Sequence, residues 1–174
     1  MCNGIQLSKS SKELDFGPGF YTTPQKEFAR ITGELRVGYR HNKGNIAVLE
    51  FETNDDIFEL LYKKVFFKPT DEWARFIIAN RCKNFLASDG FDNNRDQKYD
   101  IVIGDTADGK RGMLTFLCED VARGIRTLSS ISTEDVYPSK ASNWGEQWSF
   151  HTKRALTCIS FKSVVYYPCE EVRT

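Results

Sequence analysis

The sequence predicts an α+β domain, in which strands and helices are mixed without the regular alternation of a doubly wound parallel sheet. Residues 25–36 place apolar side chains at helical spacing, whereas residues 45–52 and 159–167 are rich in the β-branched and aromatic residues typical of strands. The chain of 174 residues fits a single domain over residues 1–174. Its 40% hydrophobic and 13% aromatic content is enough for a core.

Composition excludes several classes of protein. Lys and Arg total 24, as do Asp and Glu, so the net charge gives no electrostatic footprint for nucleic acid or an anionic membrane. No apolar run approaches the roughly 20 residues that span a bilayer, and the N-terminus lacks the pattern of a signal peptide. The five scattered cysteines form no C-x-x-C pair, and His41 and His151 are the only histidines, so we expect no metal site. The composition predicts a cytoplasmic protein with reduced thiols.

The first predicted element is a tight turn followed by a short aromatic strand. Gly17 and Gly19 flank Pro18, a combination that favours a turn because glycine tolerates unusual backbone angles and proline fixes its own. Phe20 and Tyr21 then indicate an extended segment. This arrangement suits an aromatic face held over a ligand beside backbone N–H groups, and it equally suits a structural strand-to-helix corner.

A helix over residues 25–36 follows, with Thr23 as its N-cap and Pro24 at its first position. Residues 38–44 form a turn. The strand over residues 45–52 is apolar on both faces for much of its length, which predicts a place well inside a sheet.

The clearest predicted helix begins after Thr70, its N-cap, and ends near Arg81. Asp71 and Glu72 occupy its first turn, where the helix dipole favours acidic residues. Before it, Asn54 can cap a short helix, although residues 62–68 are better interpreted as a strand. The remaining predicted elements are a polar loop at 88–98, a strand at 99–104, a helix at 113–128, a loop at 129–145, a strand at 147–151, a short helix capped by Thr152, and the last strand at 159–167.

Several polar residues are candidates for chemistry. His151 with Asp100 or Asp108 can form an acid–base pair, and Ser149 lies two residues from His151. No serine occupies a G-x-S-x-G elbow, and two residues on one strand face do not by themselves form a triad. Hydrolase chemistry is therefore poorly indicated.

Two further candidates each have a structural alternative. Arg81 at the end of an apolar helix suits either the helix C-terminus or a phosphate contact. Asp105 and Asp108 flank a glycine turn, which suits either the entrance to a substrate site or ordinary turn chemistry.

Four segments, taken together, resemble a known family. The run Phe16-Gly17-Pro18-Gly19-Phe20-Tyr21-Thr22-Thr23 resembles the second motif of ADP-ribosyltransferases of the poly(ADP-ribose) polymerase type. More closely, the ordered set LDFGPGFYTT, DEWARFIIANR, YDIVIGDTAD and QWSFHTKRAL resembles a bacterial family grouped with that superfamily. The resemblance covers roughly residues 7–162.

This resemblance implies a fold and a substrate. The fold would be ADP-ribosyltransferase-like, with two small antiparallel sheets forming a split β-sandwich with a cleft, flanked by helices. NAD would bind in that cleft as the substrate. Tyr21 would stack on the nicotinamide ring, and Gly17 and Gly19 would let the backbone approach the dinucleotide. By the same resemblance Phe20, Thr22, Arg81 and His151 are expected to line the NAD site.

The resemblance also implies catalytic roles near the C-terminus. Gln147 stands where such enzymes carry a glutamate that binds the nicotinamide ribose and stabilises its growing positive charge. Gln147 carries no charge, and Glu146 is the alternative, although neighbouring residues of a strand point to opposite faces. The family's first His-Gly motif has no counterpart before Leu7. We therefore expect either a shortened N-terminus or a different anchor for NAD, to which His151 would contribute.

The leading hypothesis is transfer of ADP-ribose from NAD to a protein or nucleic-acid acceptor by a toxin or effector. The resemblance further implies a small antitoxin-like partner protein, because family members are often encoded beside small partner genes. The rival hypothesis is a non-catalytic protein that retains the cleft for NAD or a partner chain. A purely structural protein is the third.

Overall fold

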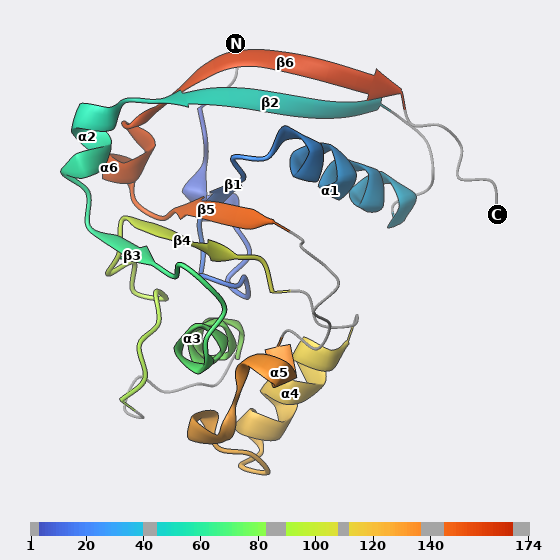
Figure 1. Cartoon of the computed structure of the whole chain (residues 1–174), viewed down its shortest axis with the longest axis vertical. Helices are drawn as coiled ribbons and strands as arrows, with labels where there is room; N and C mark the ends of the chain where they lie inside the picture. Colours follow the sequence, from blue (N-terminus) through green and yellow to red (C-terminus); the bar gives the residue numbers. More distant parts are fainter. Residues whose placement is uncertain (1–3, 40–44, 83–89, 108–111, 137–144, 169–174) are drawn as a thin grey trace.

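The protein is an α+β structure built in three layers (Figure 1). The computed structural model describes residues 4–39, 45–82, 90–107, 112–136 and 145–168. A four-stranded sheet forms the middle layer, and on one side of it lie helices α3 (Asp71–Arg81), α4 (Met113–Ala122) and α5 (Thr133–Val136). A two-stranded ribbon and helix α1 (Lys26–Tyr39) lie on the other side. The α+β class and the two small sheets agree with the prediction.

The four-stranded sheet has the order β1-β5-β4-β3. Its strands are β1 (Phe20–Thr22), β5 (Glu146–Phe150), β4 (Ile101–Asp105) and β3 (Lys63–Val65). β5 pairs antiparallel with both β1 and β4, whereas β3 pairs parallel with β4. The expectation of two antiparallel sheets was therefore wrong for the larger sheet, which is mixed. A parallel pair needs a crossover, and α3 lies in the connection between β3 and β4.

The ribbon consists of β2 (Asn45–Thr53) and β6 (Ile159–Pro168), paired antiparallel with an irregularity at Glu50/Phe51. Both strands were predicted, but the expected position of β2 inside a sheet is wrong. Among the described residues β2 pairs only with β6, so Leu49 remains 48% exposed. Apolar residues on both faces of a strand do not indicate how many other strands pair with it.

Helix α3 (Asp71–Arg81) packs against the sheet and confirms the predicted helix. The Thr70 hydroxyl accepts a hydrogen bond from the Trp73 backbone N–H at 3.3 Å, as expected of an N-cap. Trp73, Phe76 and Ile77 are buried in the main core. The sheet and α3 therefore enclose the most apolar part of the molecule.

Helix α1 (Lys26–Tyr39) begins later than predicted. The Thr23 hydroxyl accepts a hydrogen bond from the Gln25 backbone N–H at 3.2 Å, forming a local turn instead of an N-cap. Pro24 accordingly precedes the helix. The predicted turn at 38–44 falls partly within α1, and residues 40–44 lie outside the described residues.

The remaining helices are short. Helix α4 ends well before the predicted residue 128, because Gly124 at φ +70° provides a left-handed stop and Ile125 is exposed. Asn54 does cap a short helix, accepting from the Ile57 N–H at 3.0 Å, and Thr152 caps another. The described elements are η1 (Leu7–Lys9), α2 (Asp55–Glu59), α4 (Met113–Ala122), η3 (Leu128–Ser130), α5 (Thr133–Val136) and α6 (Lys153–Leu156).

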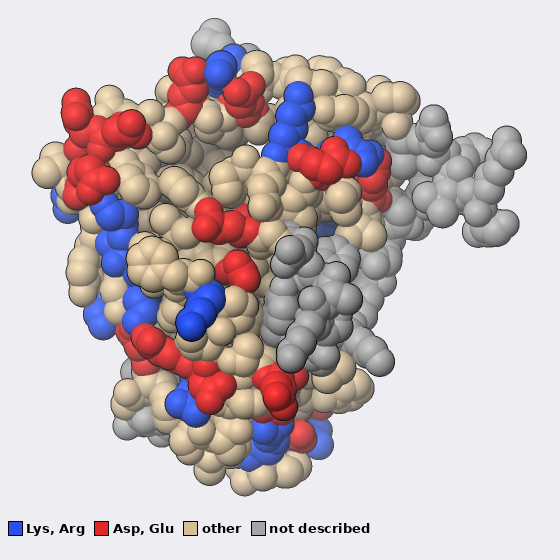
Figure 2. Space-filling view, in the orientation of Figure 1, with Lys and Arg blue, Asp and Glu red and all other residues tan. Residues whose placement is uncertain are grey.

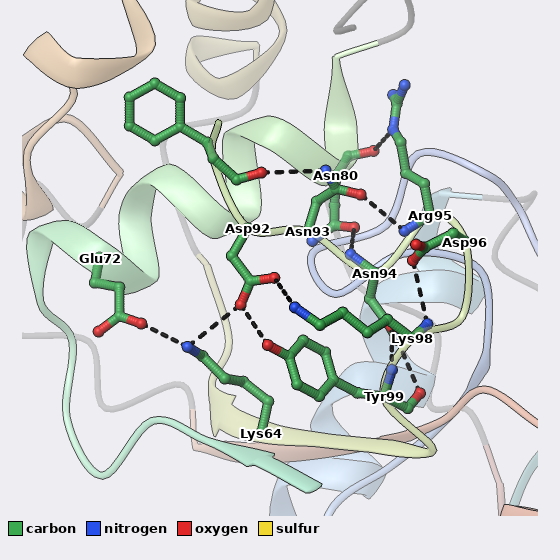
Figure 3. Close-up of polar contacts among 11 residues, drawn as sticks. Lys64, Glu72, Asn80, Asp92, Asn93, Asn94, Arg95, Asp96, Lys98 and Tyr99 are labelled. Atoms are coloured by element: carbon green, nitrogen blue, oxygen red, sulfur yellow. Dashed lines mark hydrogen bonds and ion pairs between the residues drawn. The ribbon is translucent and has the colours of Figure 1, made fainter. Parts of the chain in front are cut away.

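The loop before β4 is fastened to the end of α3 by a buried polar network (Figure 3). The fully buried Asn80 accepts from the Asn94 backbone N–H at 2.9 Å and donates to the Phe76 carbonyl at 2.8 Å. The Arg95 guanidinium donates to the carbonyls of Asn80 and Cys82, which the helix itself leaves without partners. These contacts hold the last turn of α3, and with it Arg81, against the sheet.

The surface charge agrees with the balanced composition. Figure 2 shows basic and acidic side chains interleaved on the face it displays, with acidic side chains gathered over α2, which carries Asp55, Asp56 and Glu59. In the part of the chain that the structure describes, no helix is long and apolar enough to cross a membrane.

Candidate functional site

The turn that precedes β1 packs closely against the sheet. Gly17 has φ +89°, and a Cβ there would lie 2.9 Å from the Asn94 carbonyl oxygen. At Gly19 a Cβ would lie 2.8 Å from Nδ1 of His151. Neighbouring protein atoms fill the space beside both glycines, so a residue with a side chain does not fit at either position.

Asp15 connects this turn to three distant elements. Its carboxylate pairs with the Arg81 guanidinium at 2.5 Å. It also accepts hydrogen bonds from the Gln147 side-chain amide at 2.8 Å and from the Ala107 backbone N–H at 3.1 Å. Asp15 is only 5% exposed, so its charge is satisfied entirely by these partners. The ion pair is the contact that Arg81 makes in this structure.

The pKa of Arg81 reflects this pairing. Burial acts to lower the pKa of the guanidinium, but the charge and hydrogen bond of Asp15 outweigh it and raise the pKa above its ordinary value. Arg81 therefore remains a cation beneath the turn.

Tyr21 fastens the turn from the strand side. Its hydroxyl donates to the Gly17 carbonyl at 2.7 Å and accepts from the Phe16 backbone N–H at 2.9 Å. The ring meets His151 edge-on, with centroids 6.3 Å apart and planes at 83°. Burial, followed by the nearby charge of Asp15, raises the pKa of the hydroxyl well above its ordinary range, so it stays protonated.

His151 and Ser149 form a second buried pair on the same face. His151 Nδ1 lies 2.8 Å from the Pro18 carbonyl, which can only accept, so Nδ1 carries the hydrogen. Burial lowers the pKa of His151 to about 4, so Nε2 is an unprotonated acceptor at neutral pH, 2.8 Å from Ser149 Oγ. The single Ser149 hydrogen is shared between Nε2 and the Val102 carbonyl at 2.9 Å.

The hydrogen bond between His151 and Ser149 is the kind that activates a nucleophilic serine, but Ser149 is 0% exposed. Its hydroxyl is enclosed by protein and cannot meet a substrate in this structure. The pair instead anchors the Pro18 carbonyl, and through it the turn.

Gln147 and Glu146 lie on opposite faces of β5, as strand geometry predicted. Gln147 is 8% exposed and points toward α3, donating to Asp15. Glu146 accepts from the indole N–H of Trp148 at 2.6 Å, and the Trp148 ring stacks on Phe58. Asp105 is the cross-strand neighbour of Glu146, and burial together with the charge of Glu146 raises its pKa.

The structure thus divides the predicted site residues between the two faces of one sheet. Phe20 turns toward the ribbon and packs against Phe51, with centroids 5.4 Å apart. The Thr22 hydroxyl donates to the Trp148 carbonyl at 3.4 Å. The residues brought together at the α3-facing side are Gly17, Gly19, Tyr21, Arg81, Gln147 and His151.

A small pocket opens beside this turn. Its volume is about 290 Å³, and it is lined mainly by apolar surface from Ile5, Gln6, Leu7, Lys9, Ser10, Gly19 and Phe20. The Ser10 hydroxyl lies 2.9 Å from both the N–H and the carbonyl of Gly19, which fixes the wall of the pocket. The volume lies at the lower limit of the roughly 300–1,000 Å³ that ligand pockets usually span, so the pocket has room for a small group only.

Sequence reasoning gave no role to Asp15 and did not predict the hydrogen bond between Ser149 and His151. A charged residue between Leu14 and Phe16 is the signal that could have indicated a buried carboxylate in need of a cation. Asp108 lies outside the described residues. Among the residues that the structure describes, no group of three or more His, Cys, Asp or Glu is placed to hold a metal ion.

Fold and site together define a class of protein: an α+β domain in which a glycine turn is fastened to a mixed sheet by a buried polar network. The chain belongs to the family described as "Protein of unknown function (DUF3990)", whose model matches residues 1–161. No curated protein and no solved structure matches the chain.

Proposed function

We propose that this protein is an NAD-dependent ADP-ribosyltransferase that modifies a protein or nucleic-acid acceptor, as a toxin or effector with a small antitoxin-like partner. The observation that supports it best is that Tyr21 and Gln147 share one sheet face. Tyr21 is the cross-strand partner of Ser149, which lies two residues from Gln147 on β5. Both residues are fastened to the same turn, Tyr21 through Gly17 and Gln147 through Asp15.

The chemistry proposed requires breaking the bond between nicotinamide and its ribose. Positive charge grows on the ribose as nicotinamide leaves, so a nearby acceptor oxygen lowers the barrier. The Asp15 carboxylate accepts a hydrogen bond from the Nε2 of Gln147, so Oε1 is the acceptor that Gln147 offers to a ribose. The same hydrogen bond holds the Gln147 amide in place.

A nearby feature supports a place for the nucleotide. The pocket beside Gly19 and Phe20 adjoins β1, the strand that carries Tyr21. Its lining includes neither Tyr21 nor Gln147, so it suits a planar part of NAD other than the nicotinamide ring.

One observation favours the alternative, a non-catalytic protein that binds NAD or a partner chain. The carboxylate bonded to Gln147 is that of Asp15, and Arg81 already neutralises it. Glu146, the carboxylate that could replace the missing glutamate, points to the other face.

The deciding experiment follows nicotinamide release from NAD by the purified protein and by the Gln147→Ala and Glu146→Ala variants. If Gln147 contacts the ribose, its replacement lowers the rate about 10²–10³-fold, whereas Glu146→Ala changes it little. Because the two residues are neighbours on one strand, each variant is the matched control for the other.

Tyr21→Ala is expected to abolish release, and a thermal-shift titration with NAD separates binding from chemistry. A rise in melting temperature without nicotinamide release would establish the binding alternative. Release that is absent, or unaffected by both Tyr21→Ala and Gln147→Ala, would contradict the enzymatic proposal.

A further inference from the structure

Two cysteines from different helices meet at the end of α3. Cys82 is the C-cap of α3, and Cys118 lies in α4. The Cys82 thiol donates to the Cys118 carbonyl oxygen at a distance of 3.7 Å, so the two cysteines are in direct contact. Both are free thiols in this structure.

The two thiols differ in exposure. Cys82 is 1% exposed, whereas Cys118 is only partly buried at the edge of the core. The less buried cysteine therefore lies beside a protected one, which is the arrangement of an attacking thiol and a resolving thiol.

Two guanidinium groups lie near this pair. Arg81 precedes Cys82 and pairs with Asp15, and Arg95 donates to the Cys82 carbonyl. The contact with the Cys82 thiol, followed by the charges of Arg81 and Arg95, lowers the pKa of Cys118 against the opposing effects of burial and of Glu13. The contact with Cys118 and burial raise the pKa of Cys82. Because Cys118 is also the less buried of the two, we assign it as the attacking sulfur.

We propose that Cys82 and Cys118 form an oxidisable dithiol that takes a peroxide as its oxidant and closes to a disulfide between α3 and α4. The inference rests on the positions of the two thiols and does not depend on the proposed function. It assigns a modification site directly beside the Arg81–Asp15 ion pair.

The chemistry proceeds in two balanced steps. The Cys118 thiolate attacks one oxygen of the peroxide, the O–O bond breaks, and the other oxygen leaves and takes a proton, which gives a sulfenic acid on Cys118. The Cys82 sulfur then attacks the Cys118 sulfur. The S–S bond forms, the S–O bond breaks, and the hydroxyl leaves as water with the proton of Cys82. The two thiols are oxidised together by two electrons, and the peroxide is reduced.

Cys158 provides an internal control. It is 1% exposed like Cys82, and burial raises its pKa. The charge of Asp100 raises the pKa further and that of Lys63 opposes it, so the buried Cys158 should stay inert where Cys118 reacts.

The test treats the folded full chain with hydrogen peroxide, blocks the remaining thiols with an alkylating reagent and maps the peptides by mass spectrometry. We expect a Cys82–Cys118 linked pair, and loss of the Cys118 thiol at least about 10-fold faster than that of Cys158. Peptide mapping identifies the link directly, so linkages through Cys2 or Cys169 are distinguished from it.

Variants separate the two roles. Cys118→Ser should abolish the link, whereas Cys82→Ser should leave a sulfenic acid on Cys118 that a carbon nucleophile specific for sulfenic acids can capture. Circular dichroism checks that each variant is folded, and the wild-type mapping stands without them. Absence of the Cys82–Cys118 link in the folded wild type, or its formation only in denaturant, would overturn the proposal.

Discussion

The two faces of the four-stranded sheet differ in how their polar side chains are paired. On the face toward α3, the buried polar residues Asp15, Gln147, Ser149 and His151 each have a hydrogen-bonding partner. The face toward the ribbon carries mainly apolar contacts, and at its end the acidic residues Asp105 and Glu146 lie side by side. The polar groups of the α3-facing side therefore hold one turn in place, whereas the two acids of the ribbon-facing side repel each other.

The largest effect is expected from Asp15→Ala. It would leave the Arg81 guanidinium, the Gln147 amide and the Ala107 N–H without their acceptor. Removing one partner of a buried ion pair typically costs 3–5 kcal/mol, and because the Arg81 side chain is 29% exposed we expect about 3 kcal/mol. Urea denaturation measures the loss in free energy of unfolding.

Asp15→Asn is the matched control, because it keeps the size and one acceptor oxygen but removes the charge. It should lie between the wild type and Asp15→Ala. A loss below about 1 kcal/mol in Asp15→Ala would show that the network does not organise this face.

The second prediction concerns pH. His151 has its pKa lowered to about 4 by burial, against an ordinary value near 6.5. Below pH 6.5 the unfolded chain binds a proton that the folded chain excludes, so stability falls as the pH drops from about 6.5 to about 4. The lost free energy of unfolding approaches about 3 kcal/mol at the acid end.

His151→Asn removes this titration while keeping a side-chain N–H that can reach the Pro18 carbonyl. The difference between the urea midpoints of wild type and variant should therefore change across that pH range. A constant difference would contradict the buried neutral state of His151, whatever the carboxylates contribute to both curves.

A third prediction isolates the hydroxyl of Tyr21. Tyr21→Phe keeps the ring but leaves the Phe16 N–H and the Gly17 carbonyl without their partner, at a cost of about 2 kcal/mol. Tyr62→Phe, at a 56% exposed position, is the control and should change stability little. Equal effects of the two variants in urea denaturation would show that the hydroxyl does not fasten the turn.

Local signals in the sequence predicted the elements better than the contacts between them. Thr70 caps its helix as expected because the acids and apolar residues that follow also favour that helix, whereas Thr23 has a competing turn bond to Gln25. The alternation of a strand was enough to predict that Gln147 and Glu146 face opposite ways.

The centre of the site could not be predicted in the same way. Asp15 meets partners 66, 92 and 132 residues away, and no local pattern encodes contacts of that range. The exposure of β2 escaped prediction for a related reason, because it depends on which strand pairs with it. A buried charge needs a partner, but only the fold showed that Asp15 is buried and that Arg81 is its partner.

The smallest effect is expected on the opposite face, from Asp105→Asn. Burial and the charge of Glu146 raise the pKa of Asp105, so its ionisation opposes folding, and its removal should leave stability unchanged or raise it by about 0.5 kcal/mol at pH 7. The difference from wild type should shrink as the pH falls and the wild-type carboxyl takes up its proton. Nicotinamide release should also be unaffected if the chemistry belongs to the α3-facing side. A loss of stability, or a loss of release comparable to that of Gln147→Ala, would show instead that the acidic end of the ribbon-facing side has a binding or catalytic role.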